Sequence, residues 1–383
     1  MKKIAIIGAG ISGLFFANLL RQKTEYEISI YEKNNSINLE KGYGIQLSVN
    51  SVTLLNKIGF KNINPESKFN PKKVDFYSLK KRNKICDLDI SIFNTEDAKY
   101  TTLPRSNLVE FLKEKLPSNI IQYNKKIKKI NNINKNIELI FEDKSVVECD
   151  YLVIADGIFS STKSIVENKN IKPAYSKSIA VRGTVDKFLF KSIDYKNISL
   201  FLGSNFHSVI YPVNKDNKFN FIAIFRKNLN KNQIQDYSLF KNSYFISSIL
   251  TEMSSKFDQR ILNNLENVKC FPIYVSKKIY KKKHENIFLI GDAFFASPPT
   301  LAQGASQSIE AAYELYKNLD KNIDFFIKKR TKRIKMINRR SKFNYFVFHL
   351  SSAPMIYIRD VIMKYLIKNK RFIRSYLGKI YRG

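Results

Sequence analysis

The pattern of apolar and polar positions is clearest at the start of the chain. Residues 3–7 form an unbroken apolar run of strand length, and a glycine-rich turn follows at residues 8–13. The next apolar stretch, residues 14–20, has the length of a helix, and a second strand pattern at residues 27–31 ends at Glu32. This order predicts a strand, a glycine turn, a helix and a second strand, as in dinucleotide-binding α/β domains.

Two later apolar runs also end in a glycine and an acid. Residues 150–155 lead into Asp156 and Gly157, and residues 287–290 lead into Gly291 and Asp292. Ligands of open parallel sheets bind outside the carboxyl ends of the strands, so we expect both motifs at a ligand-binding edge. An ordinary Asp-Gly turn is the alternative interpretation of the first motif.

The rest of the chain changes between strand and helix patterns. We expect a hairpin at residues 72–79 and 84–92, antiparallel strands across 178–226, and helices across 232–265. From residue 322 onward the chain is basic and expected to be helical, with a break at Pro354.

These patterns predict an α/β fold in three parts. The first is a discontinuous Rossmann-type dinucleotide-binding domain, the second an inserted, mostly antiparallel β-sheet domain for the substrate, and the third a C-terminal helical segment. The expected ranges are 1–70, 100–175 and 268–320 for the first, 71–99 and 176–267 for the second, and 321–383 for the third.

The glycine turn carries the first chemical indication. Gly8 permits the tight turn, Gly10 lets the backbone approach a pyrophosphate, and Gly13 lets the helix pack close to the strand. Glu32 would accept hydrogen bonds from a ribose diol, which favours FAD or NAD over NADP. The alternative is a glycine turn that only packs a helix on a sheet.

Composition and charge exclude several classes of function. The chain has 66 basic and 33 acidic residues, a net charge of +33 that could attract nucleic acid, anionic lipid or anionic substrates. The lysines are dispersed and no nucleic-acid-binding motif occurs, so we expect no nucleic-acid partner. Cys86, Cys149 and Cys270 show no metal-ligand spacing, so we expect no metal site and a reducing, cytoplasmic environment. We expect neither a secretory signal nor a transmembrane helix.

The three motifs in this order resemble those of the single-component FAD-dependent aromatic hydroxylases, the para-hydroxybenzoate hydroxylase family. That family has GxGxxG near the N-terminus, Asp-Gly in mid-chain and Gly-Asp late, here Gly8 to Gly13, Asp156-Gly157 and Gly291-Asp292. The resemblance covers nearly the whole chain. It implies FAD as the cofactor and NADH or NADPH as co-substrate.

The resemblance also implies roles for individual residues. Arg105 would reach the flavin side of the cofactor, Asp156 would support FAD, and Asp292 would hold the ribityl chain. Pro299 and Gly304 would belong to the loop that lines the flavin ring. The implied cofactor-binding residues are Gly8, Gly10, Ser12, Gly13, Glu32, Arg105, Asp156, Gly157, Gly291, Asp292, Pro299, Gly304 and Ala305.

Three residues are candidates for the substrate pocket. Arg182 and Tyr211 are polar side chains in otherwise apolar strands, and a buried polar group needs a partner, which a substrate can be. Phe295 stands where the family commonly has histidine, so we expect a more apolar loop beside the flavin. We expect no nucleophile from the protein.

The implied function is an FAD-dependent monooxygenase. It would use NAD(P)H and O2 to hydroxylate an aromatic or other electron-rich organic substrate through a flavin C4a-hydroperoxide. One alternative is a reductase or halogenase of the same fold, although such halogenases carry a Trp-x-Trp motif and this chain has no tryptophan. Another is a flavin-binding protein without hydroxylation.

The C-terminal residues 342–383 mix apolar residues with lysine and arginine. A basic helix with an apolar face can lie on an anionic membrane surface, which would suit a lipophilic substrate. The alternative, which we favour, is that the apolar residues cover the FAD-binding domain while the basic ones stay solvated.

Overall fold

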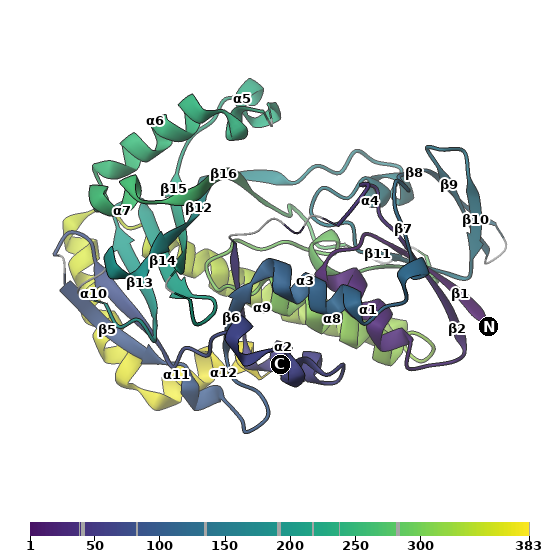
Figure 1. Ribbon diagram of the computed structural model, residues 1–383, viewed down its shortest axis with the longest axis horizontal. Coiled ribbons are helices and arrows are strands. Elements are labelled where there is room, and N and C mark those ends of the chain that lie inside the picture. Colours follow the sequence, from purple (N-terminus) through teal and green to yellow (C-terminus); the bar gives the residue numbers. More distant parts are fainter. Residues whose placement is uncertain are drawn as a thin grey trace.

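The computed structural model describes residues 1–383 apart from residues 38, 40–42, 82, 134–135, 190–192, 217, 237, 281–283 and 383. Figure 1 shows a five-stranded sheet at one end of the molecule and a seven-stranded sheet at the other, with long helices running alongside both.

The five-stranded sheet is parallel and contains the strand that begins the chain. Its order is β17-β11-β1-β2-β7. Both neighbours of β1 pair with it in parallel. Strands buried on both faces carry continuous apolar runs, which explains the patterns that mark them in the sequence. The strands are β1 (Lys2–Ile7), β2 (Tyr26–Tyr31), β7 (Ile121–Gln122), β11 (Tyr151–Ile154) and β17 (Ile287–Leu289).

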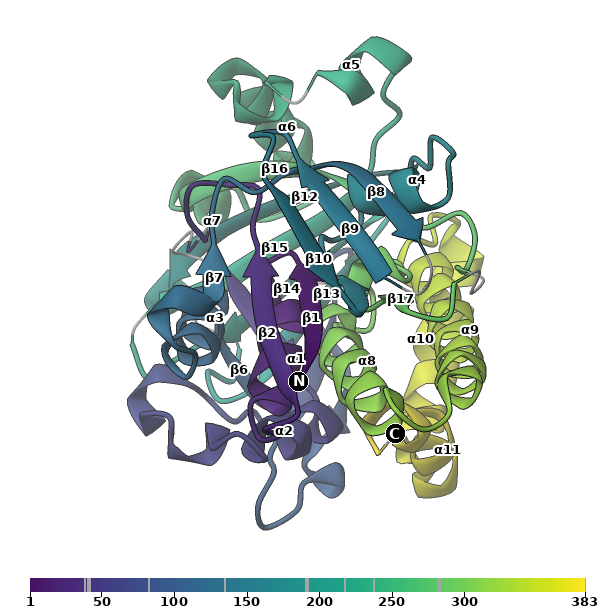
Figure 2. The same cartoon turned by 90° about the vertical axis from the view of Figure 1, so that its right-hand side faces the viewer.

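Each face of this sheet is covered by a different layer (Figure 2). Helices α1 (Ile11–Leu20), α2 (Val49–Asn56), α3 (Arg105–Glu114) and α8 (Gly304–Asn318) contribute to the core on one face. The other core includes residues of the antiparallel strands β8 (Ile127–Ile133), β9 (Asn136–Phe141) and β10 (Val146–Cys149). A Cβ at Gly13 would lie 2.2 Å from the Gly8 carbonyl oxygen, so α1 approaches β1 as closely as glycine allows.

The seven-stranded sheet has the order β16-β12-β15-β14-β13-β4-β5, and only β13 and β4 pair in parallel. Its strands are β4 (Lys73–Ser78), β5 (Asn83–Asp89), β12 (Ala174–Asp186), β13 (Ile198–Gly203), β14 (Phe206–Pro212), β15 (Lys218–Arg226) and β16 (Glu266–Val275). Side chains from α6 (Ser243–Ser254) and α7 (Gln259–Asn263) pack against this sheet, and α5 (Lys231–Gln235) precedes them.

The predicted α/β fold with an antiparallel second sheet and C-terminal helices is confirmed. The division into three residue ranges stays a proposal, and β16 carries the second sheet to Val275, past the proposed boundary at 268. Strands β3 (Gly44–Leu47) and β6 (Thr101–Pro104) form a small separate sheet, and α4 (Ser161–Val166) follows the Asp156-Gly157 turn.

Four helices end the chain. They are α9 (Ile323–Phe348), α10 (Ala353–Lys368), α11 (Lys370–Tyr376) and α12 (Gly378–Tyr381). The expected break at Pro354 lies slightly earlier: α9 ends at Phe348, and Pro354 sits in the first turn of α10, where its missing N–H costs no helical hydrogen bond. Within the described residues, no helix is both long and apolar enough to cross a membrane.

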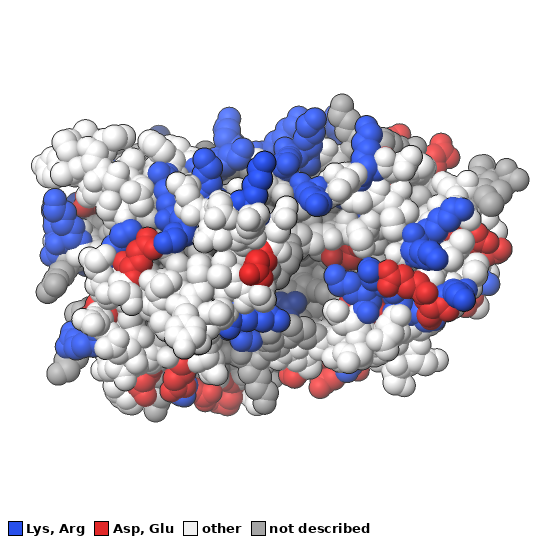
Figure 3. Space-filling view, turned by 90° about the horizontal axis from the view of Figure 1, so that it is seen from above, with Lys and Arg blue, Asp and Glu red and all other residues white. Residues whose placement is uncertain are grey.

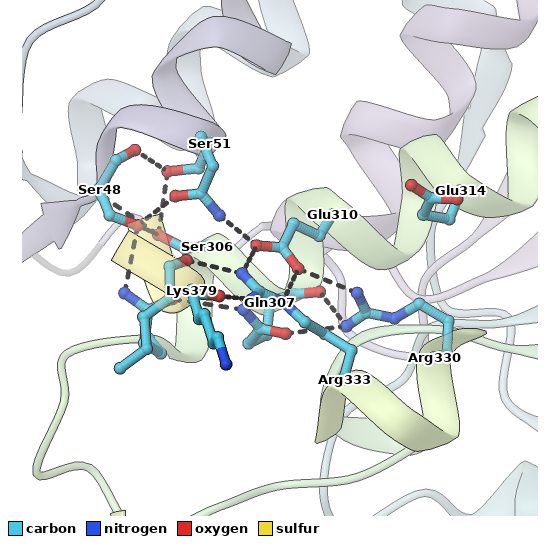
Figure 4. Close-up of polar contacts among 12 residues, drawn as sticks. Ser48, Ser51, Ser306, Gln307, Glu310, Glu314, Arg330, Arg333 and Lys379 are labelled. Atoms are coloured by element: carbon cyan, nitrogen blue, oxygen red, sulfur yellow. Dashed lines mark hydrogen bonds and ion pairs between the residues drawn. The ribbon is translucent and has the colours of Figure 1, made fainter. Parts of the chain in front are cut away.

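One buried carboxylate, Glu310 of α8, joins three of the helices (Figure 4). Its oxygens lie 3.0 Å from Nη1 of Arg330 and 2.6 Å from Nη2 of Arg333, both on α9, and Asn50 of α2 also donates to it. Burial alone would raise the pKa of Glu310, but the two guanidinium groups hold it below its ordinary value. Arg333 also donates to the carbonyls of Lys379 and Ile380, which fixes the last helix.

We predict that Glu310→Ala lowers the free energy of unfolding by about 3–5 kcal/mol, because two buried guanidinium groups lose their counter-charge. Glu314, one turn further along α8, pairs with Lys329 at a more exposed site. Glu314→Ala is the matched control and is expected to cost less than about 1 kcal/mol. Urea unfolding of both variants decides this, and equal losses would contradict the role given to Glu310.

Candidate functional site

A cavity of about 460 Å³ lies between the two sheets. One wall is the segment that follows β17, from Asp292 through the first turn of α8. The opposite wall consists of side chains from the seven-stranded sheet, among them Arg182 and Tyr211. Phe295, Pro299, Gly304 and Ala305 also line it, so seven of the predicted site residues surround one space. These are Arg182, Tyr211, Asp292, Phe295, Pro299, Gly304 and Ala305.

The other predicted cofactor residues gather where the parallel strands end. A Cβ at Gly8 would lie 2.8 Å from Cα of Asp156, and one at Gly291 would lie 2.6 Å from Oγ of Ser12. Gly8, Gly157 and Gly291 have φ values of +104°, +84° and +61°, a left-handed conformation that favours glycine. The three sequence motifs therefore form one packed edge, although they lie far apart in the chain.

Two helices point uncapped N-termini into this region. Gly10 precedes α1 and Gln303 precedes α8, and neither gives a side-chain cap. The first turns contain no acidic residue. A Cβ at Gly10 or Gly304 would meet no atom within 4 Å, so both glycines border open space. Unpaired N–H groups beside open space are suited to phosphate or carbonyl oxygens.

Two carboxylates at the strand ends have raised pKa values. The Asp292 side chain is open to the cavity, but protein surrounds that cavity, and burial raises its pKa to about 6. Burial also raises the pKa of Asp156. The Oδ1 atom of Asp156 is buried and has no hydrogen-bond partner among the described residues. Such an atom costs free energy unless a ligand hydroxyl or N–H meets it.

Glu32 and Arg105 are not among the residues that line the cavity. Glu32 accepts a hydrogen bond from the Ala9 N–H at 3.0 Å, so its carboxylate reaches the glycine turn. Its other oxygen accepts from the Asn34 N–H at 3.0 Å. Arg105 begins α3, and its N–H donates to the Tyr43 carbonyl at 2.7 Å, next to the cavity residue Gly44.

Among the described residues that line the cavity, Arg182 is the one lysine or arginine. The Arg182 guanidinium lies 5.6 Å from the ring centre of Tyr43. No carboxylate of the described residues forms an ion pair with Arg182. Tyr211, which is fully surrounded by protein, has a pKa raised to about 12 by burial, although Arg182 acts in the opposite direction. The phenol of Tyr211 is therefore neutral and can donate a hydrogen bond.

Several polar residues that line the same cavity were not predicted from the sequence, among them Gln46, Tyr100, His207 and Tyr381. Tyr100 donates to Oε1 of Gln46 at 2.8 Å, and its ring centre lies 5.6 Å from that of Tyr381. His207 lies 2.8 Å from His349, ring nitrogen to ring nitrogen, and burial lowers the pKa of both, so both are neutral. These residues come from distant segments, so no local sequence signal could have grouped them.

The residues present fit the FAD that the sequence implies. Gly10 and Gly304 leave room beside two helix N-termini for a pyrophosphate and a ring carbonyl. Glu32 could hold ribose hydroxyls, Asp292 could hold the ribityl chain, and the orphaned oxygen of Asp156 could accept from the cofactor or its surroundings. This matches a cofactor that extends from the glycine turn into the cavity.

Comparison with known proteins agrees with this site. A family model described as FAD binding domain matches residues 1–324. A salicylate hydroxylase of Pseudomonas putida is 24% identical over 339 residues, which cover 82% of this chain and 75% of that enzyme. The 3-amino-4-hydroxybenzoate 2-monooxygenase PtnB3 of Streptomyces platensis is 24% identical, covering 94% of this chain and 91% of that enzyme.

Among solved structures, Klebsiella pneumoniae HpxO complexed with FAD and uric acid has the same fold. The two chains superpose with a TM-score of 0.83 at 17% identity, covering 100% of this chain and 97% of that one.

We predict that Gly10→Ala weakens dinucleotide binding without destabilising the fold, because its Cβ would enter open space rather than protein. Gly13→Ala is the contrasting variant, since its Cβ would overlap the Gly8 carbonyl and should cost roughly 1–3 kcal/mol of stability. Bound flavin absorbance and urea unfolding separate the two effects. A Gly10→Ala protein that retains full FAD occupancy would refute the pyrophosphate site.

The raised pKa of Asp292 predicts a pH dependence in the FAD-free protein. Because the folded pKa is about 6, above the ordinary carboxyl value of 3.8, the folded state holds the proton more tightly. This contribution to stability is present at low pH and is lost as the pH rises through about 6. The stability of Asp292→Asn relative to the natural chain should therefore increase between about pH 4 and about pH 8 in urea unfolding. No change with pH would contradict it.

Proposed function

The chain belongs to the FAD binding domain family and is an FAD-dependent monooxygenase, and from this we propose that it hydroxylates a small aromatic substrate with an acidic oxygen. The observation that carries the proposal is the cavity with two unlike walls. Asp292 and the first turn of α8 form a wall suited to the cofactor. The other wall is an apolar sheet with one cation, Arg182.

The charge of Arg182 supports an anionic substrate. It borders the cavity and has no carboxylate partner among the described residues, so a carboxylate or phenolate of the substrate can supply one. Tyr211 and the pair Tyr100–Gln46 offer further hydrogen bonds. The matched enzymes are named for salicylate and an aminohydroxybenzoate, which are small aromatic acids.

The apolar part of the cavity supports a reaction that must exclude water. Phe295, Pro299 and Leu301 lie on the cofactor side, and Ile222 and Ile224 lie on the sheet. Bound FAD, once reduced by NADH or NADPH, supplies the oxygen-transfer chemistry, and the protein orients the ring and keeps water away. The neutral imidazole of His207 and the neutral phenol of Tyr211 can donate hydrogen bonds without adding charge.

The assignments of individual site residues are part of this proposal. So are the use of O2 as the second co-substrate and a peripheral contact between the basic C-terminus and a membrane.

A second flavin function, NAD(P)H oxidation without hydroxylation, would release hydrogen peroxide in amounts equal to the NAD(P)H consumed. Measuring peroxide and hydroxylated product in the same reaction separates the two functions.

We predict that Arg182→Gln raises KM for an aromatic acid about tenfold to a hundredfold, because one charge-assisted hydrogen bond contributes about 1.5–3 kcal/mol. KM for the corresponding amide should change little, and FAD occupancy should stay the same. Arg260→Gln is the matched control, since Arg260 on α7 is exposed and pairs with Asp258, the residue that caps this helix.

Substrate-stimulated NAD(P)H oxidation with the acid and the amide measures this effect. If Arg182→Gln and Arg260→Gln behave alike toward both compounds, the acidic oxygen of the substrate is not recognised at Arg182.

A further inference from the structure

Helix α10 turns its more apolar face toward solvent. The exposed fractions are 44% for Met355, 54% for Ile358, 48% for Ile362, 75% for Tyr365 and 36% for Leu366. At about 3.6 residues per turn, these positions fall within roughly 100° of the helix circumference. They therefore form one continuous stripe along the outside of the helix.

The inner face of α10 is the more polar one at its centre. Arg359 and Asp360 are both buried and form an ion pair at 2.8 Å. Among the described residues of α10, Met363 and Ile367, one and two turns further, pack against the core cluster that contains Phe348. A helix surrounded by water normally buries its apolar stripe and exposes its charges. The reversed arrangement in α10 indicates that something apolar covers the outer stripe.

The charge around the stripe identifies what covers it. Lys364 and Lys368 are exposed and form an edge between the outer stripe and the inner face. Residues 342–383 contain nine lysines and arginines and a single acidic residue, the buried Asp360. Basic side chains are also spread over the face in Figure 3, in keeping with the net charge of +33. A second copy would bring the same charge to the contact, whereas an anionic surface complements it.

An apolar stripe with lysines along its edge is the pattern of a helix that lies in a membrane interface. The apolar side chains enter the boundary of the acyl chains, and the lysine stems extend along the apolar surface to anionic headgroups. The position of α10 permits this, because the helix lies along the outside of the molecule beside β5, the edge strand of the seven-stranded sheet (Figure 1).

We infer that α10 lies in the plane of an anionic membrane surface and brings the apolar side of the substrate cavity next to the lipid. The cluster beneath α10 includes Phe76, Leu200 and Phe348, and all three also line the cavity. One layer of side chains thus separates the lipid-facing helix from the cavity. Resting on the proposed hydroxylase function, this placement favours substrates whose aromatic ring carries a lipophilic part.

Vesicle flotation with the full-length, FAD-containing protein tests the inference. The chain should bind vesicles of phosphatidylcholine with phosphatidylserine, and bind pure phosphatidylcholine vesicles much less. Ile358→Ser/Ile362→Ser/Tyr365→Ser should lower the partition coefficient at least tenfold, because three apolar side chains no longer enter the lipid. Lys364→Gln/Lys368→Gln should lower it about tenfold at low salt and less at high salt.

Two controls show whether any loss is specific to α10. Tyr244 on α6 is 86% exposed, so Tyr244→Ser removes a similar exposed ring elsewhere and should bind as the natural chain does. Lys231→Gln/Lys241→Gln removes two exposed charges from the α5 region and is the control for charge. All variants should keep their FAD absorbance and circular dichroism, because the changed residues are exposed.

Three results would overturn the inference. The first is that the natural chain does not bind anionic vesicles. The second is that the triple serine variant binds them as strongly as the natural chain does. The third is a concentration-dependent dimer of the natural chain in sedimentation velocity that is lost in the triple variant. The last result would make the stripe a protein interface. Turnover of a water-soluble aromatic acid, measured without vesicles, tests the hydroxylase function alone, since the stripe variants should keep it.

Discussion

The site depends on one buried ionic contact, the carboxylate of Glu310 between Arg330 and Arg333. Glu310 stands on α8, whose first turn lines the cavity, and Asn50 ties the same carboxylate to α2. Arg333 continues to the backbone carbonyls of the last helix, which carries the cavity residue Tyr381. Because both guanidinium groups are largely buried, they would lose their counter-charge if α8 and α9 moved apart. The first turn of α8 and the last helix, which both line the cavity, are thus connected through Glu310 and Arg333.

The cavity also has few charged side chains on its walls. Apart from Arg182 and Asp292, the described residues that line it are neutral, because burial keeps His207 unprotonated and Tyr211 protonated. Two charges of opposite sign stand on opposite walls, one suited to a substrate anion and the other to the hydroxyl groups of a cofactor. Neutral, apolar surroundings strengthen both interactions. Such surroundings suit the chemistry of a flavin cofactor.

Local sequence patterns predicted the parts of the fold that local physics determines. Three strands of the parallel sheet, β1, β11 and β17, are buried on both faces. Their apolar runs and the glycines that follow them could therefore be recognised in the sequence. The helical stretch 232–265 was predicted as a whole but is divided, because Asn230, Asn242 and Asp258 each cap a new helix. His207 and His349 are 142 residues apart, and Tyr381 at the end of the chain packs against Phe93 and Tyr100. Such groupings depend on tertiary packing and carry no local signal.

The central claim is that the cavity transfers one oxygen atom from O2 to an aromatic ring. Turnover of a small aromatic acid under ¹⁸O2, followed by mass spectrometry of the product, tests it most directly. We expect a hydroxylated product that carries one ¹⁸O atom, with the second ¹⁸O atom in water. A product labelled from solvent, or NAD(P)H consumption that yields only hydrogen peroxide with every aromatic acid tested, would contradict it.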